Sequence, residues 1–307
     1  MIDRRTLLAA GTAAALAPAL PAAAQSPAIT PAFRHVMIGG LRATVVNDGA
    51  ATRPDATQGF VMNAEPAQVA AALQAAGQPG PALVNPYNVT ILRTPAGLVA
   101  LDVGTGATPA LMVNMRNAGL DPAEVVLIAH THFHGDHIGG LLAADGSAAF
   151  PNARIAVPEI EWNFWMDPAE ESRATPARRP GFANARRRFA PYEGRITRFA
   201  PGAQVAPGVT ALATHGHSPG HVSFLVADGA AQLLVIGDAV TTPALFMANP
   251  EWYPVFDMDP TMAVATRKRL LDQVATDRIA VVGYHFPMPA TGMVERAGSG
   301  YRLVPLA

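Results

Sequence analysis

Eight of the nine histidines in this 307-residue chain fall into three short patches, and this clustering strongly constrains the fold. The densest patch, residues 130–137, follows an apolar run at 125–129 that is typical of a buried strand. A second patch follows a strand-like run at 209–213, and His285 follows another at 279–283. Histidines kept for packing or solubility would be scattered. The chain must therefore fold so that several strand ends meet at one site.

The first patch contains four metal donors within six positions, namely His132, His134, Asp136 and His137. One histidine near a strand end is usually a satisfied polar residue, but chance does not explain four donors together. Alternation along the chain directs His132 and His134 to one metal ion. The turn at Gly135 then directs Asp136 and His137 to a second. The chain has no cysteine, so imidazole and carboxylate must bind the ions. This donor set suits zinc, with manganese, cobalt or iron as alternatives.

Strand-like and helix-like segments alternate along the chain, which indicates an α/β fold. Strands are predicted at residues 89–92, 98–102, 125–129, 155–157, 209–213, 222–227, 232–236 and 279–283. Helices are predicted at residues 108–119, 158–166 and 261–275. Residues 167–191 are polar, arginine-rich and contain proline, so we expect a long loop or lid there.

The first 24 residues have the features of an export signal. Arg4-Arg5-Thr6-Leu7-Leu8 resembles a twin-arginine signal, an Ala/Leu stretch follows, and Ala22-Ala23-Ala24 is an A-x-A cleavage site. An ordinary secretory signal is the alternative. We therefore expect one mature domain, residues 25–307, that is periplasmic or secreted.

The overall composition restricts the possible partners. The formal net charge is −1, so no basic surface is expected for nucleic acid. The body of the chain contains no apolar run long enough to span a bilayer. A small-molecule substrate is the expected partner.

The histidine motifs resemble those of the metallo-β-lactamase superfamily. The run His132-x-His134-x-Asp136-His137 resembles the hallmark motif of that family. Residues 216–221 resemble its G-H-[ST]-P-G-H loop, residues 237–238 its G-D pair, and His285 its last ligand. The resemblance extends from about residue 33 to the C-terminus. It implies an αββα sandwich, with two central mixed sheets flanked by helices.

The resemblance also implies a role for each site residue. One ion would be bound by His132, His134 and His217, the other by Asp136, His137 and His285, with Asp238 shared. Two divalent ions, most simply Zn²⁺, would hold a bridging hydroxide that attacks an ester-type bond. Asp136 and Asp238 are thus the expected catalytic carboxylates. Asp238 would bridge the two ions, and Asp136 would orient the hydroxide. His215 and His221 are expected to support the ligand loop, and Asp102 to hold the metal loop by hydrogen bonds.

Three further stretches resemble the methyl parathion hydrolase group within this superfamily. They are ATHGHSPGHVSFLV, LLVIGDA and GSGYRLVPL. This resemblance implies cleavage of a phosphotriester or an activated ester, and a homodimer is possible. It also implies that Tyr87, Trp165 and Phe182 form an aromatic pocket for the leaving group.

Three alternatives stay open. Acyl-homoserine lactonases are similar, but they typically carry a tyrosine three residues after the bridging aspartate, where this chain has Thr241. A mononuclear iron oxidoreductase of this fold would bind one iron per chain. A non-catalytic zinc-binding protein would take up zinc and cleave nothing.

Overall fold

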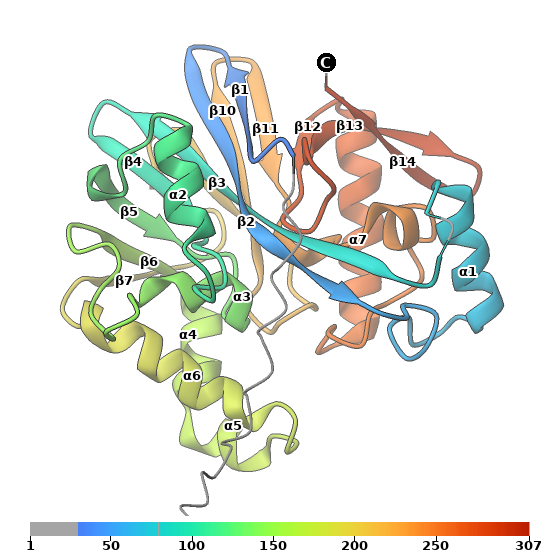
Figure 1. Ribbon diagram of the computed structural model, residues 1–307, viewed down its shortest axis with the longest axis horizontal. Helices are drawn as coiled ribbons and strands as arrows, with labels where there is room; N and C mark the ends of the chain where they lie inside the picture. The colour runs from blue at the N-terminus through green and yellow to red at the C-terminus, as the bar shows by residue number, and fades with distance from the viewer. Residues whose placement is uncertain (1–29, 79, 307) are drawn as a thin grey trace, which may run out of the picture.

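Two seven-stranded sheets pack against each other in the computed structural model, which describes residues 30–78 and 80–306 (Figure 1). The export signal expected at residues 1–24 lies outside the described residues. The first sheet runs in chain order through β1 (Phe33–Ile38), β2 (Leu41–Arg53), β3 (Leu83–Thr94), β4 (Gly97–Leu101), β5 (Val125–Ala129), β6 (Arg154–Pro158) and β7 (Ile196–Phe199). The second runs through β8 (Gln204–Ala206), β9 (Val209–Ala213), β10 (Val222–Asp228), β11 (Ala231–Val235), β12 (Ala280–Val282), β13 (Thr291–Ala297) and β14 (Gly300–Pro305).

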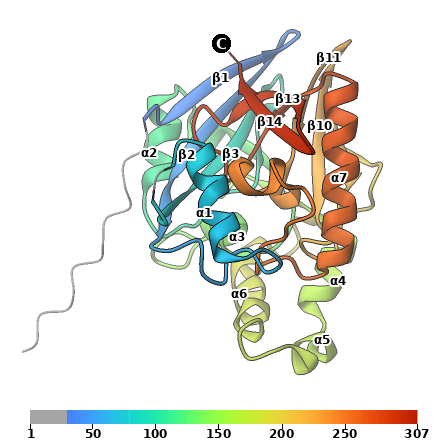
Figure 2. The same cartoon turned by 90° about the vertical axis from the view of Figure 1, so that its right-hand side faces the viewer.

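Helices lie outside the two sheets, with α2 and α7 on opposite sides of the pair (Figures 1 and 2). The helices are α1 (Pro66–Ala75), α2 (Ala110–Asn117), α3 (Gly135–Ile138), α4 (Glu159–Met166), α5 (Pro168–Arg173), α6 (Arg179–Phe189) and α7 (Pro260–Thr276). Both sheets mix parallel and antiparallel pairs, so the predicted αββα sandwich is confirmed. No helix among the described residues is both long and apolar enough to cross a membrane.

Alternating apolar residues form the core between the sheets. On β10, Val222, Phe224 and Val226 are fully buried and face the same side because the side-chain period of a strand is two. Val45 on β2 belongs to the same apolar core. Each large apolar side chain buried in this way contributes about 1.5–3 kcal/mol to the free energy of unfolding.

Parallel pairing aligns the ends of key strands at one edge of each sheet. β4 pairs in parallel with β5 in the first sheet, and β11 pairs in parallel with β12 in the second. The segments that follow β4 and β5 therefore begin side by side, as do those that follow β11 and β12. These segments carry Asp102, the histidine patch at residues 130–137, Asp238 and His285.

Residues 167–191 form two helices, and the prediction of a long loop or lid was wrong. Asp167 caps α5 by accepting a hydrogen bond from the Ala169 amide at 2.7 Å. On α6, Phe182, Ala185 and Phe189 are buried at helical spacing. The arginine run at residues 186–188 interrupts this spacing, so the polar composition of the segment concealed a narrow apolar stripe that anchors the helix.

Truncation of a core residue should test the sheet packing. Phe224→Ala should lower the free energy of unfolding by about 3–5 kcal/mol, because it leaves a cavity between the sheets. Denaturant unfolding measures this, with Met37→Ala as the control, since Met37 is 60% exposed. Equal losses in the two variants would contradict the assigned core.

Candidate active site

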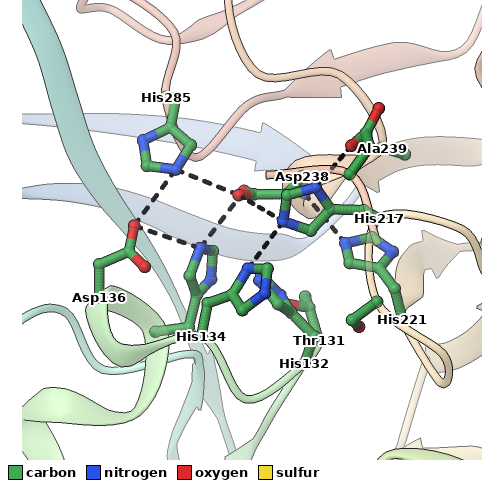
Figure 3. Close-up of polar contacts among 12 residues, drawn as sticks. Thr131, His132, His134, Asp136, His217, His221, Asp238, Ala239 and His285 are labelled. Carbon is green, nitrogen blue, oxygen red and sulfur yellow. Dashed lines mark hydrogen bonds and ion pairs between the residues drawn. The ribbon is translucent and has the colours of Figure 1, made fainter. Parts of the chain in front are cut away.

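Loops from both sheets meet at the strand ends described above and bring all seven predicted metal donors together (Figure 3). The loop after β5 and the short helix α3 carry four of these donors. The other three follow β9, β11 and β12. The donors form two groups, and within each group the ligand atoms lie within 4.8 Å of one another. One group is His132, His134, His217 and Asp238, and the other is Asp136, His137 and His285.

Asp102 fixes the loop that follows β5. It has a positive φ of 64°, and its carboxylate is buried. One carboxylate oxygen accepts a hydrogen bond from the Thr131 amide at 2.9 Å, and the other accepts from the Thr131 hydroxyl at 2.8 Å. The second oxygen also lies 2.8 Å from Nδ1 of His137. The prediction that Asp102 holds this loop through hydrogen bonds is confirmed.

The carboxylate of Asp238 lies between the two donor groups (Figure 3). Its Oδ1 lies 3.3 Å from Nε2 of His137. Its Oδ2 lies 3.3 Å from Nε2 of His217 and 3.2 Å from Nε2 of His285. Asp238 can therefore offer one oxygen to each group, as the resemblance implied for a shared ligand.

The carboxylates control the charge of the neighbouring imidazoles. Burial opposes charge on His217, but hydrogen bonds from its ring to Asp238 and Asp257 raise its pKa to about 9. Burial also opposes charge on His285, but the charge of Asp238 and a hydrogen bond to Asp136 raise its pKa to about 10. Burial, reinforced by the charge of His217, lowers the pKa of His134 to about 3. The cluster thus favours positive charge beside its aspartates, and metal ions would compete with protons there.

Several donors in this cluster are buried without a hydrogen-bond partner. They include Nε2 of His132, Nε2 of His137 and Oδ1 of Asp238. The last two lie 3.3 Å apart but are not aligned for a hydrogen bond. Buried polar atoms are nearly always satisfied, so these atoms indicate a missing partner. Imidazole and carboxylate donors in two groups fit two divalent ions.

A cavity of about 440 Å³ opens onto the donor cluster. Five of the predicted donors line it, namely His134, Asp136, His217, Asp238 and His285. The other lining residues are uncharged: Phe60, Asn85, Tyr87, Gly135, Thr241 and Phe256. Burial, together with the nearby charge of Asp136, raises the pKa of Tyr87 to about 12. The Tyr87 phenol therefore keeps its proton near neutral pH.

The structure places only one of the three predicted pocket aromatics in this cavity. Tyr87 lines it, whereas Trp165 and Phe182 lie in the core beneath α4 and α6. Their rings pack together with centroids 4.8 Å apart, and both side chains are buried. The expected pocket role of Trp165 and Phe182 is corrected accordingly, because both rings are engaged in core packing; the Trp165 ring lies between Phe182 and His134, with its centroid 6.2 Å from that of His134. Phe60 and Phe256 are the aromatic residues that sequence reasoning missed.

The two histidines predicted to support the ligand loop occupy different positions. Nε2 of His221 accepts a hydrogen bond from the Asp238 amide at 3.0 Å, and its Nδ1 lies 2.8 Å from the Thr214 hydroxyl. His221 therefore touches the backbone of the shared aspartate. His215 lies farther away, with Nδ1 3.0 Å from the carbonyl oxygen of His221.

Glu161 links the two ligand loops, and sequence reasoning missed it. One oxygen of this fully buried carboxylate accepts hydrogen bonds from the Phe133 amide at 3.2 Å and Nε1 of Trp165 at 2.6 Å. The other accepts from the Ser218 hydroxyl at 2.9 Å and the Gly220 amide at 2.7 Å. Gly220 approaches α4 so closely that no Cβ would fit there. Glu161 and Trp165 lie four residues apart on the predicted helix, and this spacing could have indicated that their side chains meet.

A buried ion pair supports His217 from behind. Oδ1 of Asp257 lies 2.8 Å from Nδ1 of His217, and its Oδ2 accepts a hydrogen bond from Arg267 at 2.8 Å. Arg267 is also buried and donates from Nε to the carbonyl oxygen of Ala239 at 3.0 Å. This pair therefore contacts one predicted metal donor, His217, and the backbone next to another, Asp238. Asp257 lies 40 residues after His217, and no spacing pattern in the sequence indicates this contact.

Residues 83–285 match the family model of the metallo-beta-lactamase superfamily. The chain therefore belongs to this superfamily. The order of the motifs, the two mixed sheets and the donor cluster agree with this assignment.

Curated relatives and solved structures extend the comparison. The N-acyl homoserine lactonase AiiA of Bacillus thuringiensis subsp. kurstaki is 28% identical over 165 residues, which are 53% of this chain and 57% of the relative. The chain thus spans little more than half the length of that relative. The structure of AidC, a dizinc quorum-quenching lactonase in complex with a product, has a TM-score of 0.79 at 21% identity and covers 90% of this chain and 97% of its own. The hydrolase AbOPH has a TM-score of 0.82 at 24% identity, with 90% and 98% covered. These structures are similar in fold.

The role of Glu161 can be tested by changing its charge and keeping its size. Glu161→Gln should weaken metal binding by about 10–100-fold, because an amide nitrogen would face hydrogen-bond donors and release both loops. Competition with a chromogenic chelator measures the affinity, and thermal unfolding checks that the variant folds. Glu159→Gln is the matched control, since Glu159 is exposed on the same helix. Unchanged affinity in a folded Glu161→Gln protein would refute the linking role.

Asp257→Asn tests the support of His217. The variant should lose about 10–100-fold in affinity for one of the two ions, because the imidazole loses its charged partner. Metal content during stepwise dialysis against chelator would show one ion released early. Glu251→Gln, exposed on the same loop, should behave as wild type. If the Asn variant retained both ions as tightly, Asp257 would serve only to neutralise Arg267.

Proposed function

We propose that this protein is a binuclear metal-dependent hydrolase that opens lactones, with acyl-homoserine lactones as the leading candidates. The observation that carries the proposal is the donor cluster at the base of a cavity with otherwise uncharged walls. The similarity to curated lactonases supports the choice of a cyclic ester.

The walls of the cavity favour a neutral substrate. Within the described part of the chain, no lysine or arginine lines it. A substrate that carries a carboxylate or a phosphate monoester would find no cationic side chain to pair with. A lactone is neutral and brings one polarisable carbonyl, which suits a site where charge develops only during the reaction.

The donor residues define where the reaction takes place. The predicted set of His132, His134, Asp136, His137, His217, Asp238 and His285 would hold two divalent ions, most simply zinc. When bound, the ions would polarise the carbonyl and lower the pKa of a water molecule. We infer that Asp136 accepts the proton of the attacking water, because its side chain is 28% exposed and that of Asp238 only 5%. Water adds to the carbonyl carbon, the ring C–O bond breaks, and the ring oxygen takes the proton to give a hydroxy acid.

Two hydroxyl groups are available to orient the carbonyl oxygen. Thr241 lines the cavity, and its hydroxyl is buried without a hydrogen-bond partner. Tyr87 lines the cavity as a protonated phenol. This arrangement supports lactone binding even though Thr241 stands where lactonases typically carry a tyrosine.

Phosphotriester cleavage, as in the methyl parathion hydrolase group, is the second candidate. The aromatic rings of Phe60, Tyr87 and Phe256 in the cavity favour an aryl leaving group. The exclusion of Trp165 and Phe182 removes two of the three contacts that this assignment implied.

We also propose export from the cytoplasm, on the signal-like residues 1–24 alone.

The test is a parallel assay of the zinc-loaded protein on N-hexanoyl-homoserine lactone, paraoxon and p-nitrophenyl acetate. We expect kcat/KM to be at least about tenfold higher for the lactone than for either other substrate, since the uncharged cavity and the hydroxyls of Thr241 and Tyr87 suit a neutral ring carbonyl. A chelator should abolish this activity. Asp238→Ala should lose most bound metal and most activity, because the Asp238 carboxylate lies within 3.3 Å of imidazoles from both donor groups.

Other outcomes would overturn the proposal in distinct ways. Faster turnover of paraoxon would favour a phosphotriesterase. Two bound zinc ions without cleavage of any substrate would indicate a zinc-binding protein. One iron per chain would indicate an oxidoreductase.

A further inference from the structure

We infer that Phe60 and Phe256, with Arg53 stacked against them, form a subsite that binds the neutral apolar part of the substrate and disfavours anionic substrates. This inference rests on the proposed function for the identity of the substrate. The subsite itself rests on three side chains and the loops that carry them.

Both phenyl rings line the cavity, but the guanidinium of Arg53 does not. Arg53 lies over the ring of Phe60, with its central carbon 4.9 Å from the centroid, and 5.9 Å from the centroid of Phe256. Each distance is within the range of a cation–π contact. The positive charge therefore lies against aromatic rings near the cavity without entering its wall.

The two rings differ in exposure and packing, so one can hold its position while the other is covered by a ligand. Phe60 is 5% exposed and packs edge-on against Phe246 with ring centroids 5.6 Å apart. Phe256 is 51% exposed, and its ring centroid lies 6.3 Å from that of Phe60. Phe60 thus provides a fixed floor. Phe256 is an exposed apolar surface that a substrate could cover.

Backbone contacts hold the two aromatic loops together. The Val255 amide donates to the carbonyl oxygen of Phe60 at 2.9 Å, and the Met62 amide donates to that of Tyr253 at 3.0 Å. Arg53 ends β2 just before the first of these loops. The rings are therefore positioned by the fold, and ligand binding is not needed to bring them together.

The arrangement has a consequence for charge. A free arginine at the cavity would attract carboxylate-bearing substrates. Here the guanidinium is engaged by two rings, and removal of one ring should make it available. Phe256 should therefore determine both the affinity for apolar groups and the discrimination against anions.

A pair of fluorescent probes tests this inference without relying on catalysis. N-phenyl-1-naphthylamine is neutral, and 8-anilinonaphthalene-1-sulfonate has the same arylamine core with one sulfonate added. Binding to the metal-loaded protein is titrated for wild type, Phe256→Ala, the double variant Phe256→Ala/Arg53→Met, and Met62→Ala. Met62 is the matched control, because it is also 51% exposed and belongs to the bridged loops but does not line the cavity.

We expect Phe256→Ala to bind the neutral probe about tenfold more weakly, because it loses a large apolar contact. The anionic probe loses the same apolar contact, but the exposed guanidinium should offset about fivefold of the loss, so its binding should weaken only about twofold. The double variant should lose this offset and bind both probes about tenfold more weakly, and Met62→Ala should match wild type. Equal effects of Phe256→Ala on both probes, or an offset that survives Arg53→Met, would overturn the inference.

The result is separable from that of the lactone assay. The expected probe pattern in a protein that opens no lactone would preserve the subsite and reject the proposed function. Lactone turnover in a protein whose probe binding ignores Phe256 would do the reverse.

Discussion

Three buried carboxylates outside the donor cluster, those of Asp102, Glu161 and Asp257, fix the segments on which the donors are placed. A buried carboxylate without partners would be costly, so each must draw hydrogen-bond donors towards it. The groups that hydrogen-bond to these carboxylates include backbone amides, hydroxyls and imidazole nitrogens of the metal loops, together with Trp165 and Arg267. The positions of the histidines therefore depend on the desolvation of acids that never face the cavity. This constraint explains how several polar rings can be held close together beneath an apolar rim.

The sequence was sufficient to predict the elements and donors that depend on local pattern. The strand at residues 125–129 has the same bounds as β5, since a parallel strand buried on both faces is a continuous apolar run. The donor motifs were visible because the loops after strands place donors at short fixed spacings. α5 was missed because none of its residues is buried, and α6 because its apolar stripe is narrow and interrupted by arginines. Polar composition indicated a loop where tertiary packing stabilises a helix.

Contacts between distant segments could not be predicted from one sequence. Glu161 meets Gly220 across 59 residues, and Asp257 meets His217 across 40. No spacing rule relates such pairs, because the relative placement of α4, α7 and the loops follows from packing. The same holds for the cavity wall, where Phe60 and Phe256 are distant in the sequence but adjacent in the structure. Trp165 was assigned to the cavity on resemblance alone, whereas its indole donates a hydrogen bond to Glu161 within the core.

Each donor group draws on both sheets. His132 and His134 follow a strand of the first sheet, whereas His217 and Asp238 follow strands of the second. The other group is divided in the same way, with His285 added to Asp136 and His137. Neither half of the chain can assemble either group alone, so a complete metal site can exist only after the two sheets have docked. Metal binding therefore reports on folding, because a chain in which the two sheets have not packed together lacks a complete set of ligands for an ion.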